Sequence, residues 1–272
     1  MISFTKMQGA GNDYIYIDNR KEIVKDPAAL SRKISDRHFG VGSDGLVLIC
    51  QSDKADIRMR MFNPDGSESE MCGNASRCVA RFAWERFFGK AKDEFDLETG
   101  AGIKHIVIRH KEGHFLSATI DMGEPILAPE KIPVSADTNR IVIDGRDFTC
   151  VSMGNPHAVT FVESVETAPV LSQGPLYEKD ASFPRKANIE FVEVLDRNHA
   201  KMRVWERGTG ETLACGTGAC ATLVACVLNE KTSREIDLEL LGGTLHIEWR
   251  KDNSHVMMTG PAEFVFEGTF EE

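Results

Sequence analysis

The sequence lacks a surplus of positive charge, a long apolar run and a basic leader segment. It has 32 Lys and Arg against 42 Asp and Glu, so its net charge is −10. This balance argues against a surface that follows nucleic-acid phosphates. The longest apolar run, Cys220 to Leu228, is far too short to span a bilayer. No signal peptide is visible, so we expect a cytoplasmic protein that binds neither nucleic acid nor membrane.

Closely spaced cysteine pairs are also missing. The chain has an odd number of cysteines, and no two of them form a Cys-x-x-Cys pair. This disfavours a disulfide framework and a structural zinc site, and we expect no bound metal. Most of the cysteines are expected to be reduced, small, buried residues. They are Cys50, Cys72, Cys78, Cys150, Cys215, Cys220 and Cys226.

The length of 272 residues, 42% of them hydrophobic, predicts two domains with real cores. No low-complexity linker separates them, so the halves are expected to pack closely. A turn at residues 111–113 marks the boundary region. We therefore predict an N-terminal half of residues 1–116 and a C-terminal half of residues 117–261, with residues 262–272 as a candidate strand that returns to the first half.

Period-two alternation of apolar and polar residues predicts many half-buried strands. Helices are predicted from Pro27 to about His38, from near Cys72 to Gly89, and from near Cys215 to Leu228. The third helix is apolar nearly all round, so it should be buried on every side. The predicted fold class is α+β, with two pseudo-symmetric domains, each a mostly antiparallel, barrel-like sheet around a central helix. The predicted strands are 14–17, 57–62, 103–108, 189–194, 201–205, 235–240, 244–249 and 264–266.

Two stretches, 59–74 and 202–217, align without a gap at a separation of 143 positions. Each ends in Cys-Gly where a helix is expected to begin. If the two halves face each other, one thiol lies on each side of a shared cleft. That arrangement is typical of moving a proton from one face of a carbon to the other. The matched pairs are Met59 with Met202, Arg60 with Arg203, Phe62 with Trp205, Glu68 with Glu211, Ser69 with Thr212, Cys72 with Cys215, and Gly73 with Gly216.

The position of each thiol suggests acid–base chemistry. A helix N-terminus carries free N–H groups and the positive end of the dipole, which lower the pKa of a thiol there. The same N–H groups can receive a carboxylate. One cysteine as thiolate would remove an α-hydrogen, and the other as thiol would return a proton to the opposite face. The alternative is that both cysteines merely fill helix starts, but their recurrence at matched positions disfavours it.

The two copies differ where side chains would hold a substrate. Glu206 stands in the second copy where Asn63 stands in the first, and Thr217 stands where Asn74 stands. An asymmetric ligand explains these differences, and ordinary sequence drift explains them equally well.

Several segments together resemble the diaminopimelate epimerase family over the whole chain. They are residues 6–13, 71–74, 154–157, 206–208 and 214–218. The resemblance implies a cofactor-independent interconversion of LL- and meso-2,6-diaminoheptanedioate, a small amino-acid substrate on the lysine and peptidoglycan precursor route. It also implies an active site in the cleft between the domains and a homodimer.

The resemblance also implies roles for individual residues. Cys72 and Cys215 are the acid/base pair, and His157 with Glu206 tunes the pKa values of the thiols. Arg207 can grip a carboxylate with its planar fork, and Glu206 can accept from an ammonium group. The implied substrate contacts are Asn12, Asn63, Gly73, Asn74, Asn155, Asn188, Glu206, Arg207, Gly216 and Thr217.

Structural readings of these polar residues remain open. Asn12 and Asn155 are also typical turn residues, and Asn63 and Asn188 suit the ends of strands. Arg207 would serve equally as a surface charge, and His157 as a loop histidine with satisfied hydrogen bonds. The chain also has Gly45 where some family members carry glutamine, so no side-chain contact can come from that position.

Other functions remain possible on the residues alone. A proline racemase on the same fold resembles Cys-Gly-His at the first turn, where this chain has Asn74. Phenazine-pathway isomerases resemble this fold without the cysteine pair. A dithiol redox protein needs two thiols that can meet, which an empty epimerase cleft also allows. A pyridoxal-phosphate racemase is disfavoured, although a Schiff-base lysine has no reliable short motif.

Overall fold

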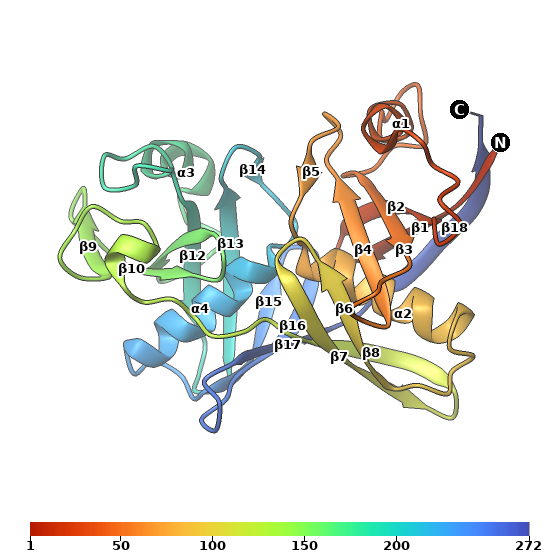
Figure 1. Ribbon diagram of the computed structural model, residues 1–272. Coiled ribbons are helices and arrows are strands. Elements are labelled where there is room, and N and C mark those ends of the chain that lie inside the picture. The colour runs from red at the N-terminus through yellow and green to blue at the C-terminus, as the bar shows by residue number, and fades with distance from the viewer. Residues whose placement is uncertain (272) are drawn as a thin grey trace. The chain divides into compact units, whose positions relative to one another are not determined.

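The computed structural model describes residues 1–271 and divides into two compact units (Figure 1). The first unit comprises Met1–Ile120 and Gly260–Glu272, and the second comprises Asp121–Thr259. The first unit is therefore completed by the C-terminal segment of the chain. No helix within residues 1–271 is long and apolar enough to cross a membrane.

The first unit is a mostly antiparallel sheet with neighbours in the order β18, β1, β2, β3, β4, β6, β7 and β8. Only the β2–β3 and β4–β6 pairs are parallel, and the short β5 pairs with the end of β4. Its elements are β1 (Ile2–Gly9), β2 (Asn12–Asp18), α1 (Pro27–Ile34), β3 (Leu46–Cys50), β4 (Ile57–Phe62), β5 (Glu68–Ser69), α2 (Gly73–Arg86), β6 (Glu94–Thr99), β7 (Gly102–Lys111), β8 (His114–Asp121) and β18 (Glu263–Phe270).

The second unit repeats this pattern, with neighbours in the order β9, β10, β11, β12, β13, β15, β16 and β17. Its parallel pairs are β11–β12 and β13–β15, and the short β14 pairs with the end of β13. Its elements are the 3₁₀ turn η1 (Pro129–Lys131), β9 (Arg140–Ile143), β10 (Arg146–Ser152), β11 (Pro156–Phe161), α3 (Val170–Tyr177), β12 (Asn188–Val194), β13 (His199–Glu206), β14 (Gly210–Glu211), α4 (Gly216–Leu228), β15 (Glu235–Leu240), β16 (Gly243–Trp249) and β17 (Val256–Gly260).

The register of the strands extends the duplication beyond the two aligned stretches. Ile15 pairs with Leu46 between β2 and β3, and Ala158 pairs with Ile189 between β11 and β12. Both members of the second pair lie 143 positions after their counterparts. The same separation relates Cys72 to Cys215, so one gapless alignment covers the strand pairs and the helix starts.

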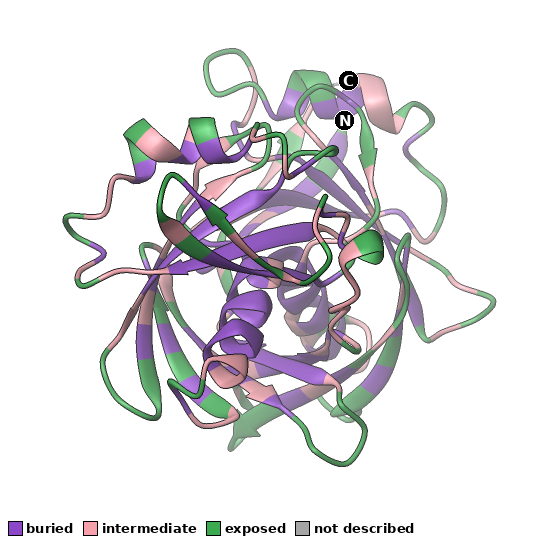
Figure 2. Cartoon of the chain, turned by 90° about the vertical axis from the view of Figure 1, so that its left-hand side faces the viewer, coloured by how far each residue is buried: buried purple, intermediate pink, exposed green. Residues whose placement is uncertain are grey.

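Each sheet is covered by helices on both faces. On one face, α1 and α3 cover apolar clusters that include Ile15 and Leu46 in the first unit and Ile189 and Phe191 in the second. On the other face, α2 packs against β1, β2 and β7, while α4 packs against strands from β10 to β16. Figure 2 shows that α4 is buried through most of its length. The α+β class with a central helix in each half is confirmed.

Two helices differ from the sequence-based expectation. Helix α1 ends at Ile34 rather than near His38, because the Asp36 carboxylate accepts from the backbone N–H groups of His38 and Phe39 at 2.7 and 2.8 Å. These bonds stabilise a turn in place of another helical turn. Helix α3 was not predicted, because it contains Gly174 and an internal Pro175 that suggest a loop.

Candidate functional site

Cys72 is the N-cap residue of α2, directly after the β4–β5 hairpin. Its Sγ donates to the side-chain Oδ1 of Asn12 at 3.3 Å. The same oxygen accepts from Asn74 Nδ2 at 3.4 Å, and Asn74 Oδ1 accepts from the buried Arg77 at 2.9 Å. The first unit thus brings Cys72, Asn12 and Asn74 together at the start of the helix.

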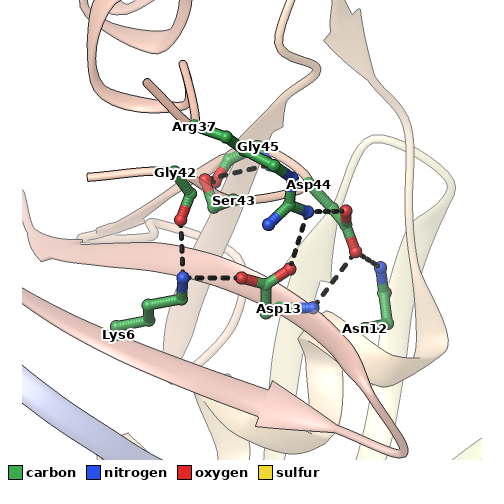
Figure 3. Close-up of polar contacts among 8 residues, drawn as sticks. All are labelled: Lys6, Asn12, Asp13, Arg37, Gly42, Ser43, Asp44 and Gly45. Atoms are coloured by element: carbon green, nitrogen blue, oxygen red, sulfur yellow. Dashed lines mark hydrogen bonds and ion pairs between the residues drawn. The ribbon is translucent and has the colours of Figure 1, made fainter. Parts of the chain in front are cut away.

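Asp44 fixes the direction of the Asn12 amide. Its Oδ2 accepts from Asn12 Nδ2 at 2.7 Å and from the Asp13 backbone N–H at 3.2 Å, while Arg37 donates to its Oδ1 at 2.9 Å (Figure 3). Because a carboxylate only accepts, the amide nitrogen of Asn12 faces Asp44 and the amide oxygen faces the thiol. Burial, followed by the charge of Asp13, raises the pKa of Asp44.

Asn63 lies just after β4 and belongs to a tight turn. Its Nδ2 donates to Ser67 Oγ at 3.0 Å, and its backbone N–H donates to the Ser67 carbonyl at 2.9 Å. Its carbonyl accepts from Ser31 Oγ of α1 at 2.8 Å. Within residues 1–271, the Asn63 side chain donates to Ser67 and not to Cys72. Gly73, in contrast, is the first residue of α2 and lies next to Cys72.

Cys215 occupies the corresponding N-cap position of α4. Its Sγ accepts from the Gly218 backbone N–H at 3.4 Å and lies 3.6 Å from Thr217 Oγ1. The prediction of a lowered pKa is nevertheless wrong for Cys215. Burial raises its pKa well above the usual value, and the charges of Glu206 and Glu190 raise it further, against a smaller lowering by the Thr217 and Gly218 hydrogen bonds. Desolvation of the thiolate outweighs the effect of the helix start.

His157 and Asn155 lie at the start of β11 beside this helix. His157 Nδ1 lies 2.6 Å from Oε1 of Glu190, and both side chains are fully buried. His157 Nε2 lies 3.0 Å from Asn155 Oδ1. The second unit thus joins the two predicted residues to Glu190, a carboxylate that was not predicted.

Asn188 and Arg207 are connected through the backbone. Asn188 Nδ2 donates to the Pro156 carbonyl at 2.8 Å, and its Oδ1 accepts from the Arg207 backbone N–H at 2.9 Å. The exposed Arg207 side chain donates to the carbonyl of Arg185 at 3.1 Å. Asn188 therefore fixes the turn that carries Arg207 and leaves the guanidinium at the surface.

Glu206 ends β13 and accepts a short hydrogen bond from the hydroxyl of Thr212. The following turn is held by Glu178, a buried residue that accepts from Trp205 Nε1 at 2.9 Å and from the Gly208 N–H at 3.1 Å. Gly216 and Thr217 form the first turn of α4. The predicted residues of the second half therefore surround one helix start and the neighbouring strand ends.

Asp44, Glu190 and Glu178 were not predicted as site residues, because none of them belongs to a Cys-Gly stretch. One signal in the sequence is the repeat, because residues 143 positions apart correspond in the two halves. By this separation Asn12 corresponds to Asn155, Tyr14 to His157, and Val47 to Glu190. Within residues 1–271, no group of three or more His, Cys, Asp or Glu side chains is arranged to hold a metal ion.

Comparison with known proteins decides the family. A sequence model described as diaminopimelate epimerase matches residues 4–128 and 149–265. The chain belongs to the diaminopimelate epimerase family. The diaminopimelate epimerase of Acetivibrio thermocellus is 56% identical over 272 residues, covering 97% of this chain and 97% of that protein. That of Methanococcus maripaludis is 53% identical over 274 residues, covering 98% and 99%.

Solved structures show the same fold outside the diaminopimelate epimerase family. A phenazine biosynthesis protein of the PhzF family from Bacillus anthracis has a TM-score of 0.72 at 19% identity, covering 98% of both chains. A hydroxyproline epimerase from Agrobacterium vitis, solved with trans-4-hydroxy-L-proline, has a TM-score of 0.70 at 15% identity, covering 98% of this chain and 90% of that chain. At these identities the likeness shows the fold alone.

Proposed function

We propose that this protein interconverts LL- and meso-2,6-diaminoheptanedioate by proton transfer between two cysteines and one α-carbon, without a cofactor. Membership of the diaminopimelate epimerase family supports the substrate. The observation that carries the mechanism is the matched placement of Cys72 and Cys215, each the N-cap of the helix that follows corresponding hairpins.

The proposed step needs only the two sulfur atoms and the substrate. One cysteine, as thiolate, takes the α-proton, so an S–H bond forms while the C–H electron pair stays on the α-carbon. The other cysteine, as thiol, gives its proton to the opposite face, and a new C–H bond forms as its S–H bond breaks. The product has the inverted configuration, and the two thiols have exchanged protonation states. Reversal exchanges the roles.

The remaining predicted residues would bind the ends of the substrate. The N–H groups at Gly73–Asn74 and Gly216–Thr217 suit a carboxylate at the reacting centre. Arg207 and Glu206 suit the distal carboxylate and ammonium. Asn12, Asn63, Asn155 and Asn188 offer amide donors and acceptors for the same groups. We also expect a homodimer in the cytoplasm, which sizing by light scattering and fractionation of cells would check.

Turnover of the LL isomer in heavy water, with no added cofactor, tests the reaction. We expect deuterium at the α-carbon of the meso product. Cys72→Ala and Cys215→Ala should each lower the rate at least about 10²-fold, because each removes one of the two proton carriers. Cys226→Ala is the control, since that thiol is buried within α4 and its pKa is raised to about 12. Near-normal turnover in either active-site variant would reject that cysteine's role.

Two further results separate the rival functions. Turnover of trans-4-hydroxyproline in place of the diaminoheptanedioate would favour an imino-acid epimerase. Activity that appears only when pyridoxal phosphate is added would reject the cofactor-independent mechanism.

A further inference from the structure

Glu190 is a buried carboxylate that the proposed proton transfer does not use. It lies in β12, its side chain has 0% exposure, and its Oε1 lies 2.6 Å from Nδ1 of the equally buried His157. Its Oε2 has no hydrogen-bond partner within residues 1–271. A buried carboxylate oxygen without a partner is costly, so it calls for a role.

This carboxylate lies near the thiol of Cys215, on the other side of Gly218. A Cβ placed on Gly218 would lie 2.8 Å from Glu190 Oε1 and 3.2 Å from Cys215 Sγ. The glycine therefore leaves no side chain between the carboxylate and the sulfur. The Gly218 N–H also donates to that sulfur at 3.4 Å, so the thiol has a helix N–H as a donor and the Glu190 carboxyl group as a neighbour.

The first unit has no carboxylate at the corresponding position. Val159 pairs with Glu190 between β11 and β12, and Tyr16 pairs with Val47 between β2 and β3. Val47 thus stands where Glu190 stands in the repeat, and Tyr14 stands where His157 stands. The environments of the two thiols differ at this point although their helices and hairpins correspond.

The ionisable groups around Glu190 come from several elements. They are His157 of β11, Cys215 at the N-cap of α4, Cys150 of β10, and Glu206 of β13, which acts on the Cys215 thiol. Burial raises the pKa of Cys150 to about 12, with a further contribution from Glu190, and the same two causes act on Cys215 together with Glu206. Each described effect of Glu190 on a neighbouring thiol favours the protonated form.

We propose that Glu190 is a positioning residue that makes the two cysteines differ in how readily they lose a proton. It holds His157 through Nδ1 and keeps Cys215 protonated in the resting protein. The inference rests on the proposed function and adds to it an assignment of resting states. Cys215 is the cysteine that is protonated in the resting protein, and its deprotonation sets the alkaline limit of activity. The apparent pKa values of the pH profile belong to the two cysteines together, so the test follows the acid limb and the alkaline limb of that profile.

Glu190→Gln removes the charge while keeping the shape. We expect the alkaline limb of kcat/KM to move to lower pH by about one unit, with a smaller change in the acid limb. Glu190→Asp keeps the charge but places it one methylene further from Cys215. Its alkaline limb should therefore lie between those of the wild-type protein and Glu190→Gln. Glu193→Gln is the matched control on the same strand, where the carboxylate accepts from the Val165 N–H at 3.0 Å, and it should leave both limbs in place.

A second readout does not depend on substrate. The ultraviolet absorbance of thiolates is titrated in the wild-type protein and in Cys215→Ser, and the difference reports Cys215. The same difference measured in the Glu190→Gln background should move to lower pH by the same amount as the alkaline limb. If the protein proves not to turn over diaminoheptanedioate, this titration still measures the coupling of Glu190 to Cys215.

The outcomes are distinct. An alkaline limb and a Cys215 titration that both stay in place in a folded Glu190→Gln protein would overturn the proposal, because the Glu190 carboxylate would then have no effect on the thiol. A lower rate with unchanged limbs would also overturn it, since that is the result of a structural role alone. If Glu190→Gln does not fold, Glu190→Asp decides by the presence or absence of its intermediate shift.

Discussion

At the scale of single residues, the Cys72 side is organised by a chain of hydrogen bonds that begins at the surface. Arg37 donates to Asp44, Asp44 accepts from Asn12, and Asn12 accepts from Cys72. An amide has two different ends, and only the carboxylate of Asp44 decides which end meets the thiol. When Cys72 carries a proton, the acceptor of that proton is therefore an amide oxygen whose direction is set by Asp44.

Replacing Asp44 by Asn should disturb this chain without unfolding the protein. The new amide can present either an oxygen or an NH₂ group to Asn12, so the direction of the Asn12 amide is no longer fixed. We expect kcat/KM for the epimerisation to fall about tenfold or more, since misplaced catalytic groups cost that much. Because Asp44 contacts an exposed arginine, the free energy of unfolding should fall by less than about 1 kcal/mol.

Asp13→Asn is the matched control for that variant. Asp13 lies in the same network and meets Arg37 and Lys6, at 3.3 and 2.8 Å, but its side chain has no described bond to Asn12. Its activity should therefore stay close to wild type. Equal losses in both variants would mean that the integrity of the loop matters, rather than the direction of the Asn12 amide.

The sequence reveals the two cysteines but not their environments. Cys72 and Cys215 stand out because a duplication repeats them with their glycines. Asp44 and Glu190 lie 28 and 25 positions earlier in the chain, and only the parallel pairing of strands brings them to the helix starts. The direction of the Cys215 pKa shift could not be predicted for the same reason, since it depends on burial and on carboxylates from other elements.

At the scale of elements, α3 shows where local sequence rules give way to packing. Gly174 and Pro175 disfavour a helix locally, yet α3 covers β13 and contributes Val170 and Tyr177 to the core of the second unit. A Cβ on Gly174 would lie 2.7 Å from Cβ and Cγ of Trp205. The glycine thus permits the close approach of helix and strand, a tertiary requirement that no local pattern carries.

Gly174→Ala should push α3 away from β13. We expect a loss of about 1–3 kcal/mol in the free energy of unfolding, as for other overpacked sites. Urea denaturation followed by circular dichroism measures it. Ser172→Ala, at an exposed position of the same helix, should change stability by less than about 0.5 kcal/mol. A neutral Gly174→Ala would show that α3 shifts freely and does not fix the strand that ends in Glu206.

At the scale of the whole chain, the first unit is completed by β18, the last strand in the sequence. β18 pairs with β1 from Ile2 opposite Phe270 to Gln8 opposite Glu263. The residues just before it accept from two arginines of α2, with Arg77 donating to the Pro261 carbonyl at 3.0 Å and Arg81 to the Ala262 carbonyl at 2.7 Å. The C-terminal segment therefore pairs with strand β1 of the sheet and accepts hydrogen bonds from α2, the helix that follows Cys72.

Removing residues 260–272 should destabilise the first unit selectively. β1 would become an exposed edge strand, and the buried Arg77 would lose an acceptor, at a cost of about 1–3 kcal/mol for that group alone. Hydrogen exchange followed by mass spectrometry should show faster exchange in β1, β2 and α2, with protection retained in β11, β12 and α4. A chain shortened only by its last two residues, which lie beyond β18, is the control. Equal loss of protection in both units would show that they do not unfold separately.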